Sequence, residues 1–249
     1  MGNGKTIAAV MAVAAFGLVS CGDSGTAVDE SSSAGAAETQ TTTTPTASAL
    51  VQGAADGSVI YALNPAESEV YWRIYRAGAL ARLGHNHVIS LVEFEGNVVV
   101  APDVADSAWE LSFPVDGLVI DDPELRARYG EDFESVPDED AKAGTKTNML
   151  TEGLLDGVNF PEIRLAGSGV EGPLDAASLP VSIYIVGNTI EQTFPASITI
   201  TEDAVTVEGE YRLTHADLGL EPFSLMGGAM AVGDEIDFTY RLRADVVGQ

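Results

Sequence analysis

Apolar and polar residues alternate along most of the chain after residue 58. The alternating runs fall at residues 70–74, 92–100, 109–115, 163–165, 181–186, 198–200, 205–213 and 236–242. In the run 92–100, one face would carry Val92, Phe94, Val98 and Val100. Because side chains two apart share one face of a strand, the pattern predicts half-buried strands. About seven or eight such strands, separated by turns such as Gly187-Asn188, indicate an antiparallel sandwich or closed barrel.

The segment from Asp121 to Leu155 interrupts this alternation. Pro123 follows two aspartates, as is typical at the start of a helix, and residues 124–129 and 148–155 have a helical composition. A dense run of acidic residues lies between these two stretches. We therefore expect an all-β fold with one small helical, acidic insertion at about residues 121–155.

The N-terminal segment has the features of an export signal. Lys5 precedes an apolar stretch, Thr6 to Ser20, that is too short to span a bilayer and has the length of a signal-peptide core. The sequence Leu18-Val19-Ser20-Cys21 is the arrangement at which bacterial lipoproteins are cleaved, and Cys21 is the only cysteine. We expect residues 1–20 to be removed and Cys21 to be lipidated. The protein would then be anchored to the bacterial cell envelope, with its folded domain in the periplasm or extracytoplasmic space.

Residues 21–57 are predicted to be a disordered tether, and residues 58–249 a single folded domain. Ser, Thr, Ala and Gly dominate the tether, which holds too little apolar surface to offset the entropy of ordering. The whole chain has 38 acidic and 12 basic residues and a net charge of -26, which becomes -27 when the signal removes Lys5. This balance argues against a nucleic-acid partner, since phosphate contacts need Lys or Arg.

Two stretches resemble the YceI-like family. Residues 148–156, followed by Phe160-Pro161-Glu162-Ile163, are similar to the family's middle signature, in which a helix leads to an aspartate and an aromatic-Pro-x-Ile strand. Residues 211–222 and 227–236 resemble its closing hairpin, and the match covers residues 58–246. The resemblance implies an eight-stranded, antiparallel, lipocalin-like barrel with a helical insertion and an elongated apolar interior. It also implies an amphiphilic ligand such as a polyisoprenoid.

The chain departs from the family pattern at three places. Leu218 stands where an aromatic residue is usual, and residues 189–193 replace a Gly-Val-Thr stretch. The segment Leu83-Gly84-His85-Asn86-His87 replaces a strand rich in Gly and Phe and is typical of a separate subgroup. The ligand of this chain therefore need not be the family's usual one.

The three histidines are the most specific chemical feature of the chain. If residues 83–89 form a strand, His85 and His87 share its inner face with Leu83 and Ile89. His215 continues an inner face that comprises Val205, Val207, Tyr211 and Leu213. Neutral imidazoles that converge could bind zinc, copper or haem iron, although no firm ligand set is evident. The alternatives are polar contacts to a ligand headgroup and structural hydrogen bonds.

Trp72, Phe113 and Tyr211 complete the candidate ligand-binding residues, because they fall on apolar strand faces. The sequence shows no serine, cysteine or paired-carboxylate arrangement for catalysis. We therefore expect a non-enzymatic protein without a cofactor that holds a long apolar or amphiphilic molecule, a polyisoprenoid or another lipid. A redox or stress protein that uses the histidines for metal or haem is the alternative, and an interaction module with a filled barrel is a further one. A homodimer is compatible with each.

Overall fold

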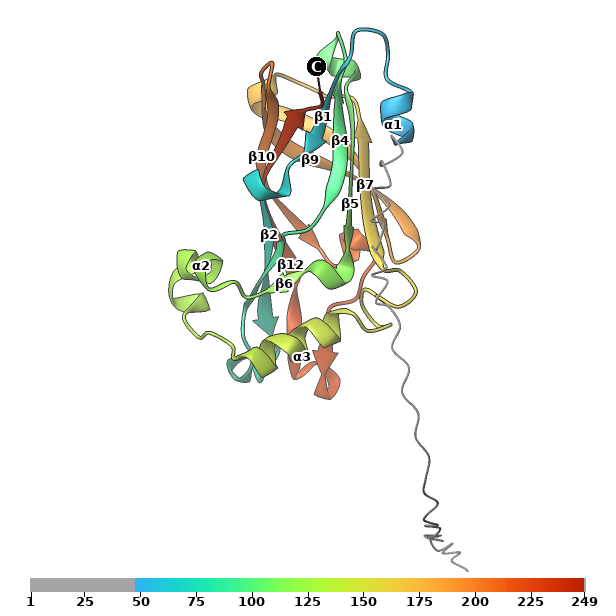
Figure 1. The fold of residues 1–249 in the computed structure, drawn as a ribbon. Helices are drawn as coiled ribbons and strands as arrows, with labels where there is room; N and C mark the ends of the chain where they lie inside the picture. Colours follow the sequence, from blue (N-terminus) through green and yellow to red (C-terminus); the bar gives the residue numbers. More distant parts are fainter. Residues whose placement is uncertain (1–47, 249) are drawn as a thin grey trace, which may run out of the picture. The chain divides into compact units, whose positions relative to one another are not determined.

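The computed structural model describes residues 48–248, and antiparallel strands occupy most of that range (Figure 1). The strands are β1 (Val59–Leu63), β2 (Glu69–Ala77), β3 (His87–Leu91), β4 (Glu95–Val100), β5 (Ala108–Pro114), β6 (Val119–Ile120), β7 (Glu162–Ser168), β8 (Ala177–Ile185), β9 (Asn188–Ile200), β10 (Ala204–Thr214), β11 (Ser224–Leu225) and β12 (Met230–Val246). The α-helices are α1 (Ala49–Gln52), α2 (Pro123–Arg126) and α3 (Glu139–Met149). Short 3₁₀ turns lie at Pro65–Glu67, Ala81–Leu83, Val104–Asp106, Val115–Gly117, Ala127–Phe133, Leu174–Ala176, Ala216–Leu218 and Met226–Gly228.

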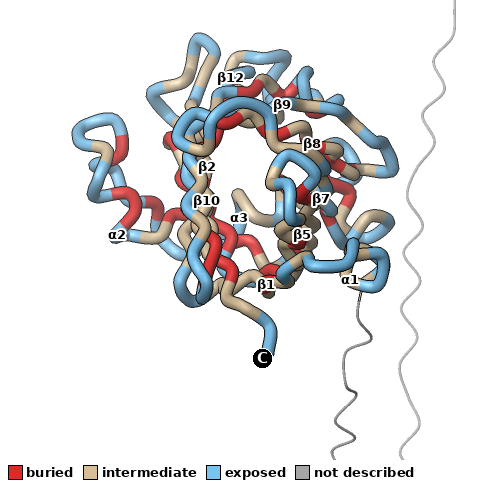
Figure 2. The backbone as a smooth tube through the Cα atoms, turned by 90° about the horizontal axis from the view of Figure 1, so that it is seen from above, coloured by how far each residue is buried: buried red, intermediate tan, exposed pale blue. Residues whose placement is uncertain are grey.

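The strands close into a barrel. The order β1-β4-β5-β7-β8-β9-β10-β12 returns on itself, because β12 pairs with β1 through contacts such as Tyr61 with Val246. The rest of β12 pairs with β2, and β3 and β6 extend the wall beyond β2. Figure 2 shows the strands encircling one interior. The prediction of an eight-stranded antiparallel barrel is confirmed.

Period-two alternation separates the interior of the barrel from its surface. In β8, the buried residues Ala177, Leu179, Val181, Ile183 and Ile185 alternate with partly exposed neighbours. The predicted inner face of residues 92–100 is wrong at its start. β4 begins only at Glu95, and Val92 is 49% exposed because residues 92–94 connect β3 to β4.

The helical insertion lies between β6 and β7, within the predicted range. The prediction of helix at residues 148–155 is wrong, because α3 covers residues 139–149 and residues 150–155 form turns. Asp122 caps α2 by accepting hydrogen bonds from two backbone N–H groups, and Asp138 caps α3 in the same way with one. Helix α3 crosses the lower end of the barrel (Figures 1 and 2). No helix within residues 48–248 is long and apolar enough to span a bilayer.

Helix α1 lies inside the range predicted as tether. Ser48 caps α1, which covers Ala49–Gln52 and so lies within residues 21–57. The Ser48 side chain accepts a hydrogen bond from the Val51 N–H, and such a local cap cannot be inferred from amino-acid composition. The predicted signal peptide, Cys21 and the tether up to residue 47 lie outside the described residues.

Two glycines differ sharply in the space around them. Gly209 of β10 pairs with Tyr240 of β12, whose hydroxyl donates to the Pro195 carbonyl, and a Cβ atom at position 209 would collide with both groups. Gly144 of α3 has nothing within 4 Å of the position of its missing Cβ. Only the first glycine makes room for another side chain.

We therefore expect Gly209→Ala to lower the free energy of unfolding by about 1–3 kcal/mol, because the added methyl overpacks the barrel. Gly144→Ala should raise it by up to about 1 kcal/mol, because alanine favours a helix over glycine. Urea denaturation followed by circular dichroism measures both. Equal effects of the two substitutions would contradict this packing argument.

Candidate ligand-binding site

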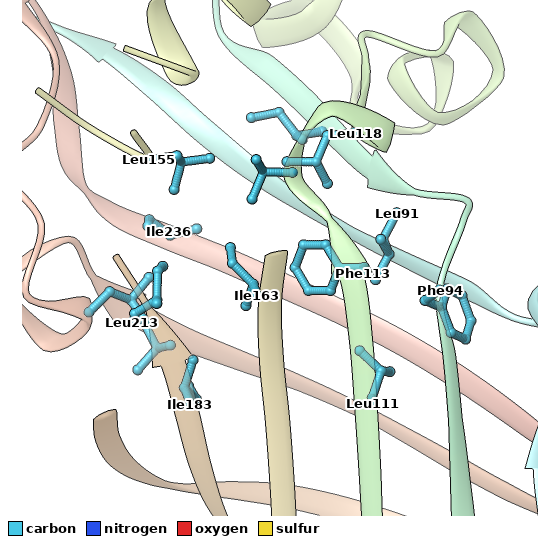
Figure 3. Close-up of a cluster of buried hydrophobic side chains, with 14 of the residues drawn as sticks. Leu91, Phe94, Leu111, Phe113, Leu118, Leu155, Ile163, Ile183, Leu213 and Ile236 are labelled. Atoms are coloured by element: carbon cyan, nitrogen blue, oxygen red, sulfur yellow. The ribbon is translucent and has the colours of Figure 1, made fainter. Parts of the chain in front are cut away.

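The barrel encloses a cavity of about 260 Å³ with an almost wholly apolar wall. Figure 3 shows inward side chains that surround this interior, including Leu111, Phe113, Ile163, Ile183 and Leu213. The few polar side chains among the lining residues are Ser107, Glu110, His215, Tyr240 and the indoles of Trp72 and Trp109. A cavity with so few hydrogen-bonding partners suits an apolar molecule better than water.

A second cavity of about 150 Å³, here called the vestibule, adjoins the first. Both are lined by Ile74, Met149, Leu154 and His215. The residues that line only the vestibule are Arg76, Ala77, Leu80, Ala81, Gly84, His85, His87, Thr145, Asn148, Phe223, Leu225, Met230, Ala231 and Val232. Helix α3 therefore forms one side of the vestibule, and the start of β12 forms another side.

On β2, β3 and β10, the inward side chains change from apolar to Arg or His within one inward position of the same height. Ile74 of β2 lies level with His87 of β3 on one side and with Ile236 of β12 on the other. Ile236 in turn pairs with Leu213 of β10. Ile74, Leu213 and Ile236 line the barrel cavity. The next residue on the inner face of β2 is Arg76, which lines the vestibule.

The other two strands show the same transition. On β3, the inward residue Ile89 lines the cavity and His87 lines the vestibule. On β10, Leu213 lines the cavity and His215, just past the end of the strand, touches both spaces. The site is therefore an apolar chamber, with one arginine and three histidines among the residues at one end.

His87 is held by a buried ion-pair network. Its Nδ1 lies 2.6 Å from Oδ2 of Asp121, a residue with 0% exposure. The other oxygen of Asp121 accepts from the Val88 N–H at 3.0 Å and from Arg126 Nη1 at 2.5 Å. Because a carboxylate accepts, Nδ1 of His87 carries the proton and Nε2 is left for the vestibule.

Arg126 ties the helical insertion to this network. It is 2% exposed, and besides Asp121 it donates to the backbone carbonyls of Asn86, Phe133 and Ser135. Burial raises the pKa of Asp121, but the hydrogen bond and the charge of His87, with help from Val88 and Arg126, outweigh it. The pKa therefore lies below its ordinary value of 3.8.

The three histidines gather at the vestibule, although not through the strand that the sequence predicted. Residues 81–83 form a 3₁₀ turn, β3 begins only at His87, and Leu83 is 56% exposed. His85 reaches the vestibule from the loop, with its ring centroid 6.2 Å from that of His87. His215 is 5% exposed, and its Nδ1 lies 3.0 Å from the Asp234 carbonyl, to which it donates. Within residues 48–248, no three His, Cys, Asp or Glu side chains are grouped as a metal site would require.

The aromatic candidates are placed differently. Trp72 and Phe113 line the cavity, and Trp72 packs against Phe238 with 5.6 Å between ring centroids. Tyr211 is not among the lining residues, because its ring packs on Phe194, which lines the cavity instead. Sequence reasoning missed Phe194 and also missed Arg76, although Arg76 stands two residues after Ile74 on the same strand face.

The family model described as the YceI-like domain matches residues 61–244. The chain belongs to the YceI-like family. These domains are binding barrels, and hydrophobic molecules are their general class of ligand. The family match does not test the prediction that residues 83–87 mark a separate subgroup.

Solved structures of the same fold include BcnA from Burkholderia cenocepacia, with a TM-score of 0.53 and 12% identity over 73% of this chain and 99% of that one. A YCEI protein from Campylobacter jejuni has a TM-score of 0.46 and 8% identity over 64% of this chain and 85% of that one. At these identities the likeness to BcnA shows the fold alone. No curated protein matches the chain.

We expect Asp121→Asn to lower the free energy of unfolding by about 3–5 kcal/mol at pH 7, because it leaves the buried Arg126 charge without its partner. The matched control is Glu69→Gln, which removes one partner of the exposed pair with Arg128 and should cost at most about 1 kcal/mol. Denaturant titrations of the three proteins measure both effects.

The pH dependence of this difference has a defined sign. Since the fold lowers the pKa of Asp121, its carboxylate stabilises the protein above pH 3.8 and loses that contribution as the pH falls through the folded-state pKa. The gap between the wild type and Asp121→Asn should therefore shrink in acid. A gap that is constant from pH 7 to pH 3 would show that the charge of Asp121 does not carry the effect.

Proposed function

We propose that this protein is a membrane-tethered, non-enzymatic binding protein that holds one long-chain amphiphile, with the chain in the barrel cavity and the polar head in the vestibule. One observation carries the proposal: the apolar cavity adjoins a space whose wall includes Arg76 and three histidines, and the two spaces share four lining residues. An amphiphile has the same division between chain and head. The cavity also argues against an interaction module whose barrel is filled by its own side chains.

Chain burial provides enough energy for such binding. Each methylene transferred from water into an apolar interior contributes about 0.8 kcal/mol, so about ten methylenes contribute up to about 8 kcal/mol before the costs of association. Shape and length decide which chain fits, and a few polar groups then set its direction. A polyisoprenoid is the ligand that the resemblance to the family implies, and other lipid chains satisfy the same physical requirements.

Anchoring through Cys21 would keep this binding site beside the membranes that contain such molecules. The proposal rests on the sequence at the cleavage site and on the composition of residues 22–47. A tethered barrel of this kind stores, shields or carries its ligand without changing it chemically.

We expect Leu165→Trp to lower the affinity for a long-chain ligand at least about tenfold, because the larger ring fills part of the cavity that Leu165 lines. Ala166→Trp is the matched control. It adds the same ring at the next position of β7, where the side chain is exposed, and should leave the affinity unchanged.

Native mass spectrometry of protein purified from its own host, combined with lipid extraction, measures the bound ligand and its loss. Equal occupancy in both variants, with the same thermal stability, would contradict binding in the barrel. A polypeptide mass without an adduct, in protein that also fails to take up added chains, would contradict the proposal as a whole.

We expect Cys21→Ala to move the protein from the membrane fraction to the soluble extracytoplasmic fraction and to abolish the incorporation of labelled fatty acid, because the thiol is the only lipid attachment point that the sequence indicates. Ser20→Ala, which keeps a small residue before the cysteine, should retain both properties. Labelled protein from cells that express Cys21→Ala would refute this assignment.

A further inference from the structure

Strands β9 and β10 pair along only part of their length. Within the described chain, their ladder covers residues 197–200 of β9 and 205–208 of β10. Past that ladder, residues 188–196 of β9 pair with β8 alone, and residues 209–214 of β10 pair with β12 alone. These two facing stretches are here called the lateral junction. The barrel wall therefore has a place on its side where neighbouring strands share no backbone ladder.

Side chains close the lateral junction. The ring of Tyr211 packs on that of Phe194, with 5.0 Å between centroids. Nearer the paired half of the two strands, the Tyr240 hydroxyl donates to the Pro195 carbonyl through the space left by Gly209. The register of β10 directs Tyr211 inward with Leu213, yet only Leu213 lines the barrel cavity. Tyr211 fills the junction instead.

Opening the wall at the lateral junction breaks no ladder hydrogen bond. Any other pair of hydrogen-bonded strands would have to lose backbone bonds to separate, which leaves buried N–H and C=O groups without partners. Across the junction the bonds come from side chains, namely Tyr240 to Pro195 and the Gln192 amide to the Asp217 carbonyl at 3.3 Å. A wall held in this way separates locally while the rest of the barrel stays paired.

β6 also has a single strand partner within residues 48–248, but the wall is closed there. The turn Val115–Gly117 joins β5 to β6, and Val115 and Leu118 are 2% and 1% exposed. The apolar residues at or beside the lateral junction are only partly buried: Ile190, Phe194, Tyr211 and Leu220. Of the two places, only the lateral junction offers an apolar surface that is reached from outside.

We propose that the apolar chain of the ligand enters and leaves the barrel cavity sideways, through the lateral junction, when the rings of Tyr211 and Phe194 separate. This inference rests on the proposed function, because it gives the route to that binding site. Phe194 and Leu213, one from each strand, line the barrel cavity, so the opened junction leads directly into it. Helix α3 crosses the lower end of the barrel, and a chain entering end-on there has to pass the helix (Figure 1).

A bridge across the lateral junction tests this route. The two tryptophans of the chain, Trp72 and Trp109, both line the barrel cavity, so dodecanol brominated at the end of its chain reports its arrival by quenching their fluorescence. Stopped-flow fluorescence of the whole chain carrying Cys21→Ala measures uptake and release. Thr193→Cys and Glu210→Cys place thiols at exposed positions on either side of the junction.

We expect a short, reducible bis-methanethiosulfonate bridge between these two thiols to slow both uptake and release at least about tenfold. The affinity should stay the same, because a closed gate raises the barrier equally in both directions. Reduction of the bridge should restore both rates. The matched control is Thr199→Cys with Thr206→Cys, bridged in the same way. These residues lie opposite each other in the paired half of the same two strands, so both rates should be unchanged.

Tyr211→Ala tests the rings themselves. Because this substitution removes the side chain that fills the lateral junction, it should raise the rates of uptake and release at least about tenfold. Tyr211→Phe keeps the ring and should leave both rates close to those of the unchanged protein. The bridged proteins keep the test decisive if Tyr211→Ala fails to fold.

The remaining outcomes separate this inference from the proposed function. Equal rates in the two bridged proteins would overturn the lateral route and leave the chain-binding barrel intact, because the probe would then enter at an end. A bridge across the junction that raises only the release rate would show a disturbed cavity and would also contradict the route. Absence of quenching in the unbridged protein would overturn the proposed function itself.

Discussion

The buried carboxylate of Asp121 links the helical insertion to the barrel wall beside the vestibule. A charge removed from water costs several kcal/mol unless other groups compensate it, and here Arg126, His87 and the Val88 N–H all do so. Arg126 belongs to the helical insertion, and His87 belongs to the barrel wall. One set of bonds thus fixes the position of the insertion and also selects the tautomer of a vestibule histidine, so the architecture and the chemistry of the site share a single constraint.

The rest of the site follows from the geometry of strands in a closed barrel. Alternation sends every second side chain inward, and these inward residues are apolar over most of the height of the wall. The exceptions, Arg76, His87 and His215, cluster at the end that α3 covers. The two ends of the interior therefore differ in their side chains, and an elongated ligand with one polar end would bind in one orientation.

The barrel and the insertion could be predicted because they depend on local patterns, namely period-two alternation and the Asp-Pro start of a helix. The site could be predicted only in part. Residues 83–86 contain apolar and imidazole side chains at strand spacing, yet they form a turn and a loop. The pairing of Asp121 with His87 joins residues 34 apart and leaves no periodic signal. Tyr211 has the right spacing but packs on Phe194. The size of the cavity depends on how side chains from opposite strands share volume, which no single strand encodes.

The pairing of β1 with β12 joins the two ends of the domain: Tyr61 lies opposite Val246. A polypeptide emerges from the ribosome with its N-terminus first, so β1 can pair with β4 early, but its other edge stays unpaired until residues 244–246 of β12 have been made. Until then the inner wall stays open along one seam and its apolar residues remain in contact with water. Closure is consequently the last event in building the barrel, and the order of synthesis requires the chain to be protected from aggregation up to that moment.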